Sequence, residues 1–227
     1  MKNTLRHALA GAIIVSGAAG AAETADVTIN GRLLPPTCSI SLSSPTVAYG
    51  TLRVSALNTD TPSHITPYLN GTDPTTTLNV SCEGPALIGA KIADQRAGTV
   101  AATDEGIDGV LGVTPTQLFG LGSFGGKSLG AYAILSSNVL VGGAAGKVIS
   151  STDNGGNWAD QSADFGLSNT AGWLWSWTSD TSGAAAEPVQ TVAQTFTIKS
   201  AVQPMNELSI TDSAPLDGLV TIELVYL

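Results

Sequence analysis

Short segments in which apolar and polar residues alternate constrain this chain most. Clear examples are residues 77–82, 191–202 and 219–227. Period-two alternation is typical of a β-strand with one buried face. No long segment repeats its apolar residues at the 3.6-residue period of a helix. The pattern therefore predicts an all-β fold, and many short strands favour a β-sandwich.

The same alternation places the remaining strands and the domain. Val27, Ile29 and Leu33 share one face, which predicts a half-buried first strand over residues 27–33. Residues 58–74 and the Gly-rich stretch 97–128 read as loops. We expect one domain over residues 23–227 with an insertion around 100–185. Further strands are predicted at residues 37–42, 46–50, 86–94, 129–135, 139–141 and 147–151.

Charge and residue types exclude several functions. Lys and Arg number 9 against 18 Asp and Glu, a net charge of -9. Binding to nucleic acid needs clustered cations, so it is not expected. Two Cys and two His cannot form the usual structural zinc site, and no metal or cofactor is expected. Because no nucleophile elbow or phosphate loop is present, the sequence predicts a protein that is not an enzyme.

The N-terminus has the order of a secretory signal peptide. Lys2 and Arg6 precede an apolar run over residues 8–15, and small residues follow up to Ala22. The apolar run is too short for a membrane span. We expect residues 1–22 to be removed by cleavage after Ala21 or Ala22. This predicts a periplasmic or cell-surface location in a Gram-negative bacterium, without a transmembrane segment.

Export changes the interpretation of the two cysteines. In an oxidising compartment Cys38 and Cys82 are expected to form one disulfide. By loop-entropy reasoning such a bridge stabilises the fold by roughly 3–4 kcal/mol. The alternative of a catalytic thiol has no support, because no His lies near either Cys in the sequence.

Residues 151–158 match the Asp-box pattern Ser-x-Asp-x-Gly-x-x-Trp. In this pattern Asp153 caps a turn, Gly155 takes a positive φ and Trp158 packs over the hairpin. The motif resembles the hairpin repeated in sialidase-type propellers. Since only one copy is present, we interpret it as a structural hairpin and not as part of a glycosidase.

Three further tryptophans lie at period two. Trp173, Trp175 and Trp177 occupy one face of a predicted strand. Exposed, they would form a platform for a sugar or a protein; buried, they would be core. Core packing is the preferred interpretation because large aromatic side chains are mostly buried.

Three sets of residues carry a family resemblance. The run Ile29-Asn30-Gly31-Arg32-Leu33 before Cys38 resembles the first strand of chaperone–usher pilins. The end of the chain, from Gly218 to the penultimate Tyr226 and Leu227, looks like the C-terminal strand of a pilin. Short interior segments are similar to a proteobacterial family described as probable beta-fimbrial major subunits. These segments are residues 47–52, 78–82, 94–96, 119–122, 130–132, 216–218 and 223–227.

The resemblance implies an immunoglobulin-like, pilin-type β-sandwich that lacks its final strand. A periplasmic chaperone, and then a neighbouring fimbrial subunit delivered through an usher, would fill the gap by β-strand addition. A complete sandwich that merely ends in a strand is the alternative. The residues expected to border the gap and contact the chaperone are Val220, Ile222, Leu224, Tyr226 and Leu227.

One departure from polymerising pilins concerns the donated strand. Only residues 23–26 precede Val27 in the expected mature chain, and they show no apolar alternation. One hypothesis is therefore a tip, terminal or stand-alone protein that accepts a strand and has none to give. The alternative is that residues 27–33 are themselves the donated element.

The sequence thus predicts a non-enzymatic, exported structural or adhesive subunit of fimbrial type. The rival interpretation is a stand-alone periplasmic binding protein. It would have a complete sandwich and a glycan or small-molecule site near the Trp strand.

Overall fold

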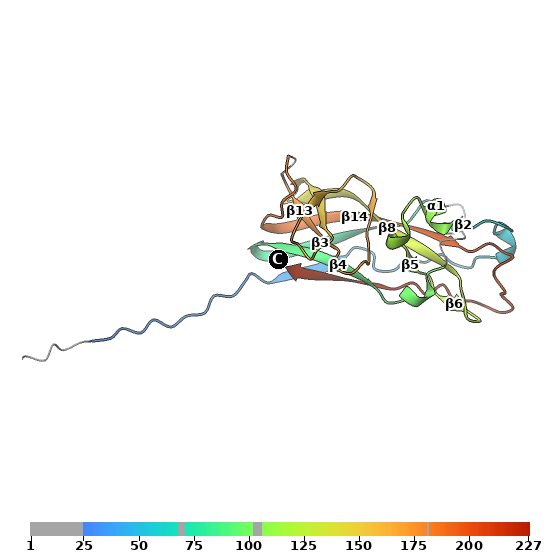
Figure 1. Ribbon diagram of the computed structural model, residues 1–227, viewed down its shortest axis with the longest axis horizontal. Coiled ribbons are helices and arrows are strands. Elements are labelled where there is room, and N and C mark those ends of the chain that lie inside the picture. The colour runs from blue at the N-terminus through green and yellow to red at the C-terminus, as the bar shows by residue number, and fades with distance from the viewer. Residues whose placement is uncertain (1–24, 68–70, 102–105, 181) are drawn as a thin grey trace, which may run out of the picture. The chain divides into compact units, whose positions relative to one another are not determined.

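The computed structural model describes residues 25–67, 71–101, 106–180 and 182–227. The chain divides into a segment that ends at Leu34 and a compact unit, Pro35–Leu227 (Figure 1). The predicted signal peptide and both candidate cleavage positions lie outside the described residues.

The prediction of a first strand over residues 27–33 is wrong. Residues 25–34 form no strand, and Val27, Ile29 and Leu33 are 88%, 91% and 100% exposed. Alternation shows that a segment is suited to bury one face, but it does not show which surface covers that face. These residues therefore form an extended apolar segment, which we term the free segment (residues 27–33).

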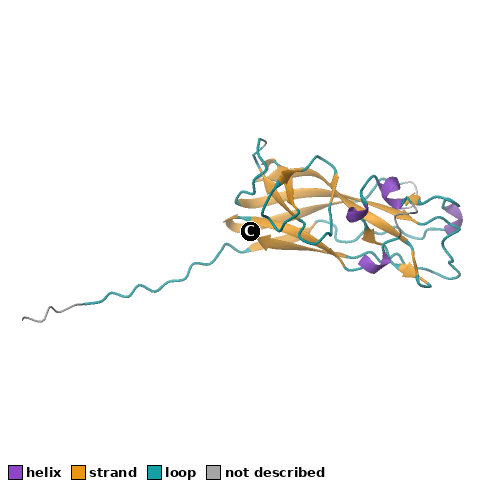
Figure 2. Cartoon of the chain, in the orientation of Figure 1, coloured by secondary structure: helices purple, strands orange, loops and turns teal. Residues whose placement is uncertain are grey.

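The compact unit is almost all β, as predicted, and is built from antiparallel sheets (Figure 2). The first sheet has the strand order β1-β3-β14-β8-β12. β2 pairs with β14, while β5 and β9 pair with β8. Its strands are β1 (Cys38–Leu42), β2 (Ser63–Ile65), β3 (Thr75–Ala86), β5 (Phe119–Gly120), β8 (Gly130–Val141), β9 (Ala144–Ala145), β12 (Phe165–Gly166) and β14 (Val189–Val202).

The second sheet has the order β11-β10-β13-β4-β15. Its strands are β4 (Ile88–Asp94), β10 (Lys147–Ser151), β11 (Ala159–Asp160), β13 (Leu174–Thr178) and β15 (Val220–Tyr226). A separate hairpin pairs β6 (Ser123–Phe124) with β7 (Lys127–Ser128). The helices are short: η1 (Val54–Ala56), η3 (Ala97–Thr99), α1 (Ile107–Leu111) and η5 (Pro115–Gln117).

The two main sheets bury one common core, which makes the unit a β-sandwich. The strand β3 alternates between exposed and buried residues along most of its length. The first sheet contributes Leu78 and Phe196 to the core, and the second contributes Ile88, Trp175 and Trp177. Alternation along each strand is what two apolar sheet faces packed together require.

The range expected as an insertion is built into both sheets. β8 lies beside β14 in the first sheet, and β13 lies between β10 and β4 in the second. The two strands predicted at residues 129–135 and 139–141 are one strand, β8. It continues through Asn138, which has a φ of 33°, next to a register shift against β14. Such a bulge keeps the strand paired while it interrupts the alternation seen in sequence.

Candidate functional site: a groove between two free sheet edges

Each main sheet ends in a strand with one unpaired edge. β1 is the last strand of the first sheet, and β15 is the last strand of the second. The Tyr226 hydroxyl donates a hydrogen bond to the Pro36 carbonyl at 2.7 Å, so the end of β15 lies beside the start of β1. Half-buried apolar side chains line both edges and pack on the core: Cys38, Ile40 and Leu42 of β1, and Val220, Ile222 and Leu224 of β15.

The five residues that the sequence placed beside a missing strand are thus on this side of the sandwich. Val220, Ile222 and Leu224 face the core, while Tyr226 and Leu227 are 48% and 39% exposed. The Leu227 side chain packs close to Gly89 of β4. Glu223 lies outward on β15 and pairs with Lys91 at 3.1 Å.

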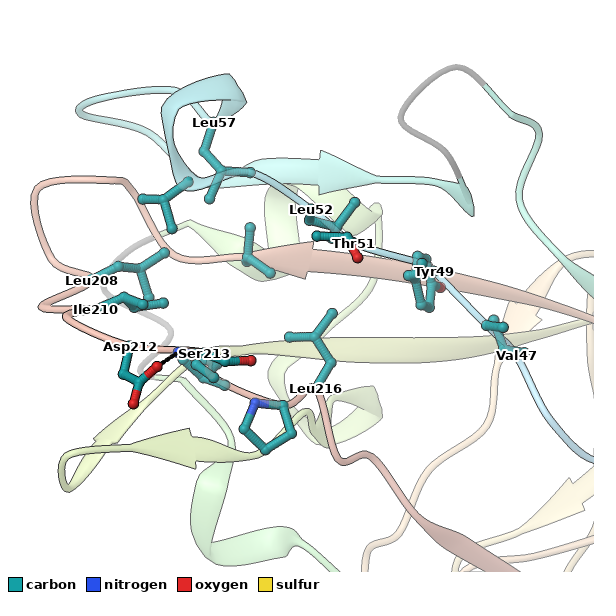
Figure 3. A pocket seen from close by; sticks show the side chains of 17 residues that line it. Val47, Tyr49, Thr51, Leu52, Leu57, Leu208, Ile210, Asp212, Ser213 and Leu216 are labelled. Carbon is teal, nitrogen blue, oxygen red and sulfur yellow. Dashed lines mark hydrogen bonds between the residues drawn. The ribbon is translucent and has the colours of Figure 1, made fainter.

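Beyond β1 and β15 the two edges continue as the walls of a groove of about 610 Å³. The first wall is residues 47–57, and the second wall is residues 208–216; Leu129 and Val202 complete the lining. Figure 3 shows the two walls facing each other. Their apolar side chains are Val47, Tyr49, Leu52, Val54 and Leu57 on the first wall, and Leu208, Ile210 and Leu216 on the second.

The backbone of both walls is largely unpaired. Within the described residues, neither 47–52 nor 209–216 forms a backbone–backbone hydrogen bond. The Tyr49 hydroxyl bonds to the Ser200 hydroxyl at 2.7 Å, which fixes the first wall on β14. Burial raises the pKa of the Tyr49 phenol, so it stays neutral. Unpaired backbone groups can hydrogen-bond to one more β-strand, and the half-buried apolar side chains beside them can pack against its side chains.

Sequence analysis predicted a strand over part of the first wall, and that prediction is wrong; for the second wall it predicted no element. Residues 46–50 were predicted as a strand because they alternate, and their apolar side chains do face the core, but they pair with no neighbour. The second wall holds Pro215 and small polar residues, so it carried no strand signal. The second wall lines the groove because the fold places it opposite the first wall.

The predicted disulfide is confirmed. Cys38 and Cys82 are directly opposite each other on β1 and β3, and their sulfurs are bonded. The bridge ties the edge strand β1 to β3, its neighbour in the sheet. It therefore holds the groove side of the first sheet in place.

Comparison with known protein families gives a match over the N-terminal part of the chain. Residues 27–133 are similar to a family described as "Protein of unknown function (DUF1120)". The match covers a little less than half of the chain, including the free segment and the first wall. No curated protein and no solved structure matches this chain.

The tryptophan strand is core and not an exposed platform. Trp175 and Trp177 are 0% exposed, and Trp173 is partly buried against Trp175 and Phe165. Both buried indole N–H groups donate to Oε1 of Gln194, at 3.1 Å and 2.7 Å. The ligand-platform interpretation therefore does not hold for Trp175 and Trp177, because the first sheet covers their face.

The Asp-box forms the predicted hairpin turn between β10 and β11. Asp153 accepts hydrogen bonds from the Ser151 hydroxyl at 2.6 Å and from the backbone and side chain of Asn157. These bonds, led by that from Ser151, lower the pKa of the Asp153 carboxyl to about 2. Gly155 has a φ of 92°, and its backbone passes against Trp158. The motif is thus a structural turn here.

A second hollow, of about 580 Å³, lies where β8 faces β10 and residues 161–165. Its lining mixes small polar side chains with Val139, Leu140 and Phe165, and none of Trp173, Trp175 and Trp177 is in it. In the described part of the chain, no three metal-ligating side chains gather. No helix there is long and apolar enough to cross a bilayer.

Proposed function

We propose that this protein is an exported structural or adhesive subunit of fimbrial type that assembles by β-strand complementation. The groove accepts an extended strand, first from a periplasmic chaperone and then from a neighbouring subunit. One observation supports this most: in the described residues, the groove is bounded by two largely unpaired backbones, and most of their apolar side chains are only half-buried.

The energetics favour an occupant in β conformation. A strand laid between the walls gives the free N–H and C=O groups partners, and its alternate side chains cover the half-buried residues. Each apolar side chain that becomes fully buried adds about 1.5–3 kcal/mol relative to exposure. Left open, two such edges favour aggregation, which is the reason that a chaperone is part of the proposal.

The free segment is the natural strand to donate. Val27, Ile29 and Leu33 alternate with polar residues, and all three side chains are exposed. Seven extended residues span about 23 Å, the length of a typical strand. The structure thus supports the alternative in which residues 27–33 are the donated element. The hypothesis of a chain with no strand to give loses its basis, because that hypothesis counted these residues as part of the sandwich.

A chain with both a groove and a free segment can link to further copies head to tail. Such a heterologous contact does not close on itself and produces a linear assembly. The resemblance of the C-terminal strand to that of pilins agrees with this arrangement. The disulfide is compatible with an extracellular or periplasmic location, where we place the protein.

The test is the mass of the assembly formed by the expected mature chain. The chain from residue 23 is produced in a bacterial periplasm and analysed by native mass spectrometry. We expect linked chains, or a one-to-one complex with a chaperone. Ile29→Asp places a charge on the apolar face of the free segment and should reduce linkage at least tenfold.

Thr28→Asp is the matched control, because it adds the same charge to the opposite face of the same segment. It should leave the assembly unchanged. The proposal fails if the parent chain is a chaperone-free monomer whose mass distribution equals that of Ile29→Asp. That outcome would favour the stand-alone binding protein.

A further inference from the structure

Three segments that are far apart in the sequence meet at the end of β4. Asp94 accepts hydrogen bonds from the backbone N–H groups of Arg96 at 2.7 Å and of Gly120 at 2.8 Å. The Arg96 guanidinium reaches Asp217, with Nε at 3.0 Å and a terminal nitrogen at 2.9 Å from one carboxylate oxygen. The Asp217 N–H in turn donates to the Leu121 carbonyl at 2.9 Å. The end of β4, the loop at 119–122 and residue 217 are thereby joined.

Glycines let these backbones approach closely. A Cβ on Gly120 would lie 2.0 Å from the Arg96 carbonyl oxygen, and one on Gly218 would lie 2.6 Å from the Tyr132 ring. Gly122 has a φ of 102°, and a Cβ there would lie 3.2 Å from the Asp217 nitrogen. The contact therefore accepts no side chain at Gly120 without a backbone shift, and none at Gly218 without a displacement of the Tyr132 ring.

This contact holds one end of the second wall. The other end is tied at residues 205 and 206, whose N–H groups donate to Asn58 and Thr59. Within the described residues, the stretch 209–216 between these ties has no backbone–backbone hydrogen bond. Its position is thus set by its ends, and the Asp217 end lies next to the apolar residue Leu216 of the groove.

We infer that Asp94, Arg96 and Asp217 form a latch that sets the position of the second wall and so tunes how tightly the groove holds a strand. They are positioning residues, which act through the wall and do not touch the occupant. The inference rests on the proposed function. The side chains of Arg96 and Asp217 are 35% and 57% exposed, so this ion pair adds little to global stability. The ion pair instead affects the position of the second wall, whose residues 209–216 form no backbone–backbone hydrogen bond within the described residues.

The test measures binding of a synthetic peptide with the sequence of residues 25–35. The acceptor is the mature chain carrying Ile29→Asp, which disables its own free segment and keeps the chain intact. We expect Arg96→Gln and Asp217→Asn each to weaken peptide binding roughly two- to fivefold, the effect of one partly exposed ion pair. The double variant should be no weaker than the stronger single variant, because both changes remove one interaction. Asp217→Glu, which keeps the charge, should restore part of the affinity.

Asp160→Asn is the matched control. It removes a comparably exposed carboxylate from the ion pair with Lys147 between β10 and β11, at the end of the second sheet away from β15. The peptide should bind this control variant as tightly as it binds the acceptor. Hydrogen exchange on the acceptor without peptide gives a second readout: the Asp217 amide, which donates to the Leu121 carbonyl, should exchange faster in the latch variants and not in the control.

The outcomes separate the two proposals. Tight binding of the peptide to acceptor and latch variants alike, with equal exchange, overturns the latch and leaves the proposed function standing. Absence of peptide binding to the acceptor overturns the proposed function and, with it, the role of the latch.

Discussion

At the scale of the residue, one buried amide connects the two sheets. Gln194 of β14 is fully buried; its oxygen accepts from Trp175 and Trp177 of the second sheet. Its amide nitrogen donates to the Ser136 hydroxyl of β8 at 2.7 Å. Buried polar groups are tolerated when every partner is satisfied, and here three buried donors and acceptors depend on one side chain.

Replacing Gln194 with Ala should therefore be costly. The change leaves two indole N–H groups and Ser136 without a partner and opens a cavity, so we expect a loss of about 2–4 kcal/mol in the free energy of unfolding. Urea unfolding followed by tryptophan fluorescence measures this. Thr195→Ala, on the opposite face of β14, is the control and should cost less than about 1 kcal/mol. A Gln194→Ala midpoint equal to that of Thr195→Ala would contradict the network.

Asp153 gives a prediction about acid stability. Its pKa in the folded protein is about 2, below the ordinary value of 3.8, so the folded state favours the ionised carboxylate. The resulting stabilisation is complete above about pH 4 to 5 and is lost as the pH falls through about 2. The difference in stability between the parent and Asp153→Asn should thus be constant near neutrality and shrink in acid.

Thermal unfolding at pH 7, 5, 4 and 2.5 tests this difference. A difference for Asp153→Asn that grows as the pH falls would show that the turn prefers the protonated acid.

At the scale of the element, β1 depends on its covalent tie. It has five residues, a neighbour on one side only and a half-buried apolar face. The bridge between Cys38 and Cys82 closes a separation of 44 residues. A short edge strand of this kind opens easily once the constraint is removed.

The Cys38→Ser/Cys82→Ser double variant should lose roughly 3–4 kcal/mol of stability by loop-entropy reasoning. Hydrogen exchange should also become faster in β1 than in β14, which has neighbours on both sides. Equal protection of β1 and β14 in that variant would contradict this account of the edge strand.

Element by element, alternation predicted the strands well where both faces had a fixed environment. β10 agrees with its predicted range of 147–151, and β1, β4, β14 and β15 agree within a few residues. The free segment carries the same signal but forms no strand. Period-two alternation shows that one face of a segment is suited to burial, but it does not show which part of which chain will cover that face. The second wall was missed for the converse reason: its position makes it part of the groove, while its alternation stops after Thr211 and Pro215 follows. The latch could not be predicted either, since it joins Asp94, Arg96 and Asp217 only through the fold.

At the scale of the whole molecule, the protein presents a complementary pair of features. The sandwich has the edge strands β1 and β15 and, beyond them, a groove whose two walls carry apolar side chains, and the same chain carries an exposed apolar segment in extended form. Unpaired edges and exposed apolar segments favour association with a partner. Both features agree with the proposed assembly by strand complementation.

Hydrogen exchange of the two walls tests the central claim most directly. The mature chain with Ile29→Asp is compared with and without the peptide of residues 25–35, and with the same peptide carrying Ile29→Asp as control. A strand that enters the groove gives partners to both walls at once, so amides in 47–52 and in 209–216 should both exchange at least tenfold more slowly with the parent peptide alone. Unchanged exchange in both walls at saturating peptide, or slowing that is the same with the control peptide, would contradict strand complementation.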